Sequence, residues 1–101
     1  MGTRLDLHEV LCDILGSRFV YFQPPASVKM TYPAIVYGLS GIDNTHANNS
    51  PYRQVRSYMV TLIDKDPDSP IIGDLSRLPA CRFDRHYVAD NLNHYVFTLY
   101  F

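Results

Sequence analysis

The chain has 101 residues, of which 47% are hydrophobic and 19% are charged, and its formal net charge is -1. At roughly 100–150 residues per domain, this length predicts one domain, residues 1–101, and excludes a nucleotide-binding fold with an attached substrate domain. The near-neutral charge argues against a protein that grips nucleic acid through a basic surface, because that mode needs clustered Lys and Arg.

Residues 3–15 predict an amphipathic helix. Thr3 is the expected N-cap, and Asp6 can supply the acidic partner of a capping box. Gly16 is a natural stop for the helix. The apolar stripe follows helical spacing and needs a surface to cover; it consists of Leu7, Val10, Leu11, Ile14 and Leu15.

The next segment combines short apolar runs with a long polar stretch. Residues 19–22 predict a short strand or an extended crossing. Residues 34–39 predict a strand. Their apolar residues occupy both odd and even positions, so both faces of the strand are apolar, which predicts burial on both faces. Residues 41–51 have no large apolar residue after Ile42 and predict an exposed loop of about ten residues. Long loops of this kind are usually functional or disordered.

The second half alternates strands with one helix. Residues 53–64 predict a long half-buried antiparallel strand, since apolar and polar residues alternate along it. After an acidic turn, Ser69 and Pro70 are expected at the N-cap and first position of a second amphipathic helix, which Pro79 ends.

Two strands, residues 81–88 and 94–101, are predicted to close the chain around an Asp- and Asn-rich turn. The predicted class is α+β, with an antiparallel or mostly antiparallel sheet of about four strands packed by two helices. The predicted order is α-(β)-β-β-α-β-β.

Cys12 and Cys81 predict buried free thiols, because two cysteines do not make the disulfide framework of a small secreted domain. We expect no secretory signal peptide, since no basic segment precedes an apolar one at the N-terminus. No apolar run approaches the roughly 20 residues of a membrane-spanning helix. These features predict a protein that is cytosolic or assembled in a cytosol.

The spacing of Asp64, Asp66 and Asp68 is that of a calcium-binding loop. The rest of the motif fails, because Ser69 stands at the position of the loop glycine and Leu75 at that of the bidentate Glu. An exposed acidic turn is the favoured interpretation, since it places negative charge near the N-terminus of the second helix.

The sequence evidence for a zinc site or a hydrolase site is equally weak. Cys81 and His86 are five apart on one predicted strand, so alternation places them on opposite faces and argues against a shared zinc site. A hydrolase could use Asp84, Arg85, His86 and Asp90, but a solvated hairpin end with cross-strand ion pairs is favoured. We predict no catalytic residue, no cofactor and no metal site. The eight Tyr and five Phe favour instead an oligomeric interaction module, because aromatic residues recur at interfaces.

Three stretches carry a resemblance to a known family: residues 24–37 (PPASVKMTYPAIVY), 58–69 (YMVTLIDKDPDS) and 83–101 (FDRHYVADNLNHYVFTLYF). Together with the length and the order of elements, they resemble small tail-terminator proteins of long-tailed bacteriophages, also called head–tail joining or minor capsid proteins. The likeness spans nearly the whole chain but includes no catalytic motif.

The resemblance implies a structural role in the virion after assembly in the host cytoplasm. Six copies would form a ring that caps the tail tube, blocks the addition of further tube subunits and presents a surface to the head–tail connector. DNA would pass through the lumen without sequence-specific binding, which fits the near-neutral charge. The alternatives are an adjacent connector or tail-completion subunit and, less favoured, a small hydrolase or ligand-binding domain. No membrane partner is expected.

The family supplies no residue with a chemical role to carry over, so the predicted contact residues come from this sequence alone. We expect the 41–53 segment to reach a neighbouring subunit or the tube through His46, Asn48, Asn49, Tyr52 and Arg53. We expect Asp64, Asp66 and Asp68 to form an exposed acidic turn. This turn would face the lumen or pair with Arg53, Arg56 or Arg82 of a neighbour.

Overall fold

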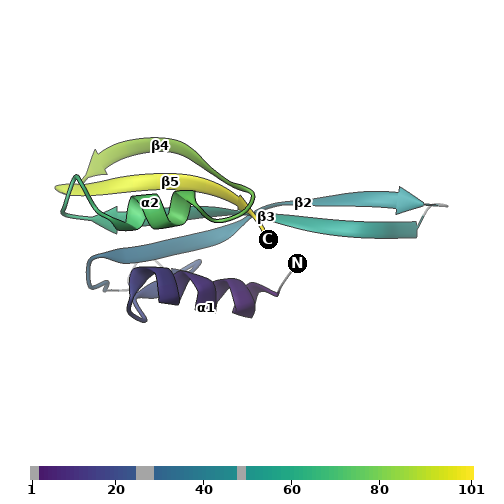
Figure 1. The fold of residues 1–101 in the computed structure, drawn as a ribbon, viewed down its shortest axis with the longest axis horizontal. Helices are drawn as coiled ribbons and strands as arrows, with labels where there is room; N and C mark the ends of the chain where they lie inside the picture. The colour runs from purple at the N-terminus through teal and green to yellow at the C-terminus, as the bar shows by residue number, and fades with distance from the viewer. Residues whose placement is uncertain (1–2, 25–28, 48–49) are drawn as a thin grey trace.

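Two helices and one five-stranded sheet make up the computed structural model (Figure 1), which describes residues 3–24, 29–47 and 50–101 and, within 43–54, the backbone alone. The sheet order is β1-β2-β3-β5-β4. β1 runs parallel to β2, and the other neighbouring strands are antiparallel. The elements are α1 (Arg4–Leu15), β1 (Val20–Phe22), β2 (Ala34–Ala47), β3 (Ser50–Asp64), α2 (Ile71–Ser76), β4 (Cys81–Ala89) and β5 (Leu92–Tyr100).

The α+β class with two helices is confirmed, and the sheet is mixed with five strands where the sequence predicts about four. The difference lies in residues 20–22, which do form a strand and pair in parallel with residues 35–37. The order of elements agrees with the predicted order.

Local signals set both ends of α1. The Thr3 hydroxyl accepts a hydrogen bond from the Asp6 amide at 3.2 Å, and the Asp6 carboxylate accepts one from the Thr3 amide at 3.0 Å. These two bonds form the predicted capping box. Gly16 ends the helix at φ 79°, a left-handed conformation that glycine adopts without steric cost, and its amide donates to the Cys12 carbonyl.

Both helices cover the same face of the sheet, because alternate residues of the strands project there. Leu7 and Leu11 of α1 and Leu75 of α2 are almost fully buried. Complete burial of such side chains stabilises the fold by roughly 1.5–3 kcal/mol each. They pack in one core cluster with the sheet residues Val20, Ile35, Tyr37, Tyr58, Val60, Leu62, Tyr95, Phe97 and Leu99.

The other face of the sheet has no helix over it within the described residues, and the expectation that residues 34–39 are buried on both faces holds only in part. On that face Ala34 is buried, but Val36 is only half-buried. Apolar residues at all positions of a strand therefore do not mean that both faces are covered.

The loop predicted for residues 41–51 is wrong. β2 continues to Ala47 and β3 already begins at Ser50, so most of this segment is a strand ladder. The physical reason is that antiparallel strands are joined by backbone hydrogen bonds, which polar residues form as well as apolar ones. Composition alone therefore concealed a hairpin.

The C-terminal half follows the prediction with one change at the start of α2. α2 starts at Ile71, one residue later than expected, although the Ser69 hydroxyl still accepts a hydrogen bond from the Ile71 amide at 3.4 Å. The turn between β4 and β5 has φ 53° at Asp90 and 61° at Asn91. Positive φ at both central residues is typical of a type I′ turn, which matches the twist of the flanking strands.

Candidate interaction surfaces

The far part of the β2–β3 hairpin, residues 43–47 and 50–55, forms an arm that extends away from the helices (Figure 1). Its strands pair with each other from Asp43 opposite Val55 to Ala47 opposite Ser50, with a register shift between Thr45 and His46. Among the described residues neither of its strands pairs with a third one, because β5 leaves β3 at Ser57. The molecule is 51 Å long and 28 Å by 23 Å across, and the arm accounts for much of its elongation.

The arm carries the residues predicted to touch a neighbour, although as strand residues and not as a loop. His46 lies in β2 opposite Pro51, and Arg53 lies in β3 opposite Thr45. Tyr52 is also part of β3. Asn48 and Asn49 lie outside the described residues. Their contact with a subunit or tube remains a prediction.

Four exposed apolar side chains surround the base of the arm, and we call them the neck: Leu39, Ile42, Met59 and Tyr100, which are 41–44% exposed. Leu39 is the register partner of buried Tyr58 and therefore lies on the helix-covered face. Met59 and Tyr100 lie on the opposite face, since both alternate with buried core residues. Apolar surface is thus exposed on both sides of the point where the arm leaves the body.

An apolar groove of about 320 Å³ adjoins the neck. It lies between the first half of α1, the segment that follows α2 and the end of β5. Tyr100 belongs to both the groove and the neck. The groove is lined by Leu7, Val10, Leu78, Pro79, Ala80, Leu99, Tyr100 and Phe101.

The acidic turn lies at the opposite end of β3 from the arm. Asp64 is the last residue of the strand, and Asp66 and Asp68 are exposed. The Asp64 carboxylate accepts a hydrogen bond from the Asp66 amide at 3.1 Å, and the Asp66 carboxylate accepts one from the Asp68 amide at 2.9 Å. These local bonds shape the turn, but its role in facing a lumen or a neighbour remains a prediction.

Side chains of β5 attach this turn to the sheet. The Tyr95 hydroxyl donates to the Pro67 carbonyl at 2.8 Å, and the Asn93 amide donates to the Lys65 carbonyl at 3.4 Å. Burial, reinforced by the nearby carboxylates, raises the pKa of Tyr95, so its hydroxyl keeps the proton that makes this bond. Across residues 3–24, 29–47 and 50–101, no three His, Cys, Asp or Glu side chains are grouped to hold a metal ion.

The charged residues of β4 do not converge on one site. Asp84 accepts a hydrogen bond from the Thr98 hydroxyl and pairs with Arg82 at 3.5 Å. His86 stacks on Tyr95, with ring centroids 4.7 Å apart. Thr98 and Tyr95 project to opposite faces of β5, so Asp84 and His86 are separated by the sheet. This separation does not favour the hydrolase alternative.

A bulge in β4 overturns the face assignment of Cys81 and His86. The register shifts between Phe83 and Arg85, so both residues stand opposite buried β5 side chains on the helix-covered face. Both cysteines are free, as predicted; Cys12 is buried, whereas Cys81 is only partly so. Burial raises the pKa of each thiol.

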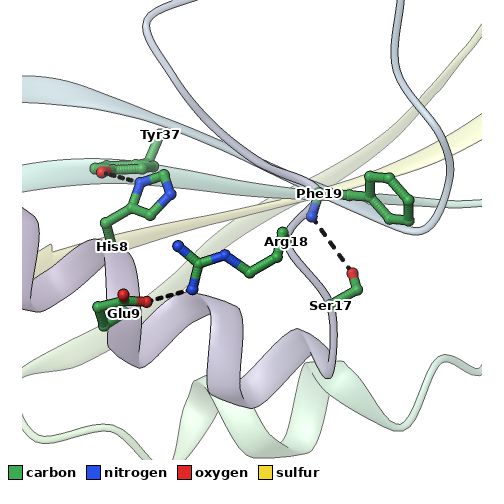
Figure 2. Close-up of polar contacts among 6 residues, drawn as sticks. All are labelled: His8, Glu9, Ser17, Arg18, Phe19 and Tyr37. Atoms are coloured by element: carbon green, nitrogen blue, oxygen red, sulfur yellow. Dashed lines mark hydrogen bonds and ion pairs between the residues drawn. The ribbon is translucent and has the colours of Figure 1, made fainter.

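A polar cluster joins α1 to the sheet at Tyr37, as Figure 2 shows in part. The His8 Nδ1 atom lies 2.8 Å from the Tyr37 hydroxyl oxygen, and the Arg4 guanidinium donates to the same oxygen at 3.3 Å. Arg4 also lies over the Phe22 ring, 4.4 Å from its centre. Beside this cluster, Arg18 forms an ion pair with Glu9, the residue that follows His8, at 2.5 Å (Figure 2).

No protein-family model and no curated protein sequence matches the chain. In the described part of the chain, none of the helices combines the length and the apolar character needed to cross a membrane.

Sequence reasoning missed the neck, the groove and the Tyr37 cluster. Leu39 and Ile42 were visible as apolar residues before a polar segment, which could have indicated an exposed patch at a strand end. The groove brings together α1, the 78–80 segment and the chain end, and His8 meets Tyr37 across 29 residues. Contacts this distant leave no local signal in a single sequence.

Proposed function

We propose that the protein is a structural virion subunit of a long-tailed bacteriophage, a tail terminator whose copies close into a ring at the end of the tail tube. The observation that carries this proposal is the arm, a two-stranded ladder that leaves the body without a third strand in the described residues. In a subunit that works by contact with other chains, such an extension serves as a contact surface.

The energetics of the arm support a role in assembly. A two-stranded hairpin on its own is marginally stable in water, because it buries little apolar surface. In a ring, the body of a neighbouring copy or the tail tube would cover the arm and supply the missing contacts. His46, Tyr52 and Arg53 are the arm residues proposed to make them.

The neck extends the same contact surface. Specific interfaces combine an apolar centre with a polar rim and are enriched in Tyr, Phe, Met and Arg. The neck supplies exposed Leu, Ile, Met and Tyr side chains at the base of a largely polar arm. An interface centred on the neck and bordered by the arm would have this composition.

The proposal requires that the arm of one copy contacts the body of the next copy without a reciprocal contact. Such a contact is head to tail, and identical head-to-tail contacts either close into a ring or continue as a filament, whereas a reciprocal exchange of arms gives a two-fold dimer. A ring is the form that caps a tube. The described residues of the three stretches that carry the family resemblance, namely 24, 29–37, 58–69 and 83–101, lie in the body.

The test is the size and shape of the purified chain at increasing concentration, measured by mass photometry and negative-stain imaging. The proposal predicts closed rings with a central hole, six copies being the number that the resemblance implies. A chain that remains a monomer or dimer at every concentration contradicts it.

A ring alone does not distinguish a terminator from the adjacent connector layer. The terminator is expected to bind the open end of purified tail tubes and stop their growth. A ring that binds only the head connector would assign the chain to the neighbouring layer instead.

A further inference from the structure

The polar part of the contact between α1 and β2 centres on the hydroxyl group of one buried tyrosine. Tyr37 is 1% exposed. Its oxygen lies 2.8 Å from His8 Nδ1 and 3.3 Å from Arg4 Nη1. Both partners belong to α1, and Figure 2 shows the His8 ring reaching from the helix to this hydroxyl.

The inventory of donors and acceptors selects one arrangement of protons. An arginine guanidinium can only donate, so the Tyr37 oxygen accepts from Arg4. The single proton of the Tyr37 hydroxyl then needs an acceptor, and the lone pair of His8 Nδ1 is in place to accept it. This requires a neutral His8 with its proton on Nε2, and it gives both the oxygen and the proton of the Tyr37 hydroxyl a partner.

Protonation of His8 breaks this arrangement. Both ring nitrogens then carry hydrogen, so Nδ1 donates to Tyr37 and the tyrosine proton loses its acceptor inside the protein. A buried polar hydrogen without a partner is costly. The positive ring would also face Arg4 on the same helix, with Arg18 nearby.

Burial and the surrounding charges also favour the neutral form of His8. Burial lowers the pKa of His8, and Arg18 and Arg4 lower it further. Glu9 opposes them, but its carboxylate is engaged by Arg18. From β1 the cluster is bordered by the Phe22 ring, which carries no charge, and in α2 Asp74 and Arg77 pair with each other at 3.0 Å.

We propose that His8 and Tyr37 form a pH-sensitive latch, in which neutral His8 holds the first half of α1 against β2 and protonated His8 releases it. Leu7 and Val10 lie in the same half of the helix and line the apolar groove. Release of the latch therefore loosens one wall of that groove. The inference does not depend on the proposed role in a virion.

The direct test is the imidazole signal of His8 in an NMR pH titration of the intact chain. The latch predicts the Nε2–H form at neutral pH and a titration midpoint below the ordinary histidine value of about 6.5. An Nδ1–H form at neutral pH, or a midpoint at or above the ordinary value, would overturn it. Both the tautomer and the midpoint are measured on the wild-type chain, so this test does not depend on the folding of a variant.

Two variants separate the latch from a merely structural contact. Tyr37→Phe removes the hydroxyl, so the His8 midpoint should rise, because protonation no longer isolates a buried proton. Tyr87→Phe removes a hydroxyl from a half-exposed ring on β4 and should leave the midpoint unchanged. Equal midpoints in the wild type and Tyr37→Phe would contradict the latch.

The latch also gives stability a defined pH dependence. A histidine whose pKa is lowered on folding binds more protons in the unfolded state, so stability is lost as the pH falls from about 6.5 to the lower pKa of the folded state. The unfolding midpoint of the wild type should therefore drop on acidification more than that of Tyr37→Phe. The same drop of the unfolding midpoint in the wild type and in Tyr37→Phe counts against the latch.

Discussion

β2 and β3 run through both the body and the arm, and the two regions show what stabilises a strand pair. In the body, Tyr37 and Val60 are register partners and are buried beneath the helices. In the arm, the same ladder continues without a third strand among the described residues. Backbone pairing is common to both regions, and the buried apolar side chains that the structure describes lie in the body. We infer that the body determines whether the chain folds and that the arm serves association.

The largest expected contrast between the two regions is in amide hydrogen exchange. Amides of residues 43–47, 50 and 52–55 should open with a free energy near zero, whereas those of the central strands should approach the global stability of about 5–15 kcal/mol. The measurement is native-state exchange at a concentration where the chain is monomeric. Arm amides as well protected as those of β5 would remove the contrast.

Truncation of a core side chain should lower the free energy of unfolding far more than truncation of an arm side chain. Phe97 is fully buried, so Phe97→Ala should lower the free energy of unfolding by about 3–5 kcal/mol. The matched arm variant Gln54→Ala should change it by less than about 0.5 kcal/mol. Urea titrations measure both, and similar losses in the two variants would show that the arm belongs to the folding unit.

The capping box at α1 tests a smaller contribution to the body. Thr3→Ala removes the hydroxyl that accepts from the Asp6 amide and should cost about 0.5–2 kcal/mol. Asp13→Ala, at an exposed position of the same helix, serves as the control and should cost less. If thermal unfolding shows equal losses for both, the box contributes nothing beyond helix propensity.

The smallest effect is expected at the type I′ turn. Asn91 has φ 61°, and Asn91→Gly removes the cost of a side chain in that conformation, for a gain of up to about 1 kcal/mol. Gly16→Ala should act in the opposite direction, because Gly16 has φ 79° and an alanine there is strained. Thermal unfolding that shows a loss for Asn91→Gly would contradict the turn assignment.

The sequence predicts the body well because its signals are local. The Thr3–Asp6 capping box, the stop at Gly16 and the alternation through Tyr58 and Val60 each depend on neighbours within a few residues. These signals fix the helix ends and the face of the sheet that the helices cover.

The features that the sequence does not predict depend on pairing between distant segments. The arm consists largely of polar residues that resemble a loop in composition, and only pairing between its two halves makes it a ladder. A bulge after Phe83 shifts the register and brings Cys81 and His86 to one face, which strict alternation cannot predict. The neck and the groove likewise form only when distant segments meet.

The most direct test of the division between body and arm is a chain with a shortened arm. Asn44 and Gln54 are register partners, so replacing residues 45–53 with Asn-Gly joins them through a two-residue turn. Mass photometry then reports assembly, and circular dichroism reports folding. Asn91→Gly, which alters the turn at the far end of the body, is the control. We predict that the shortened chain folds as a monomer while the wild type and the control form rings; rings formed without the arm, or a body that no longer folds, would contradict that division.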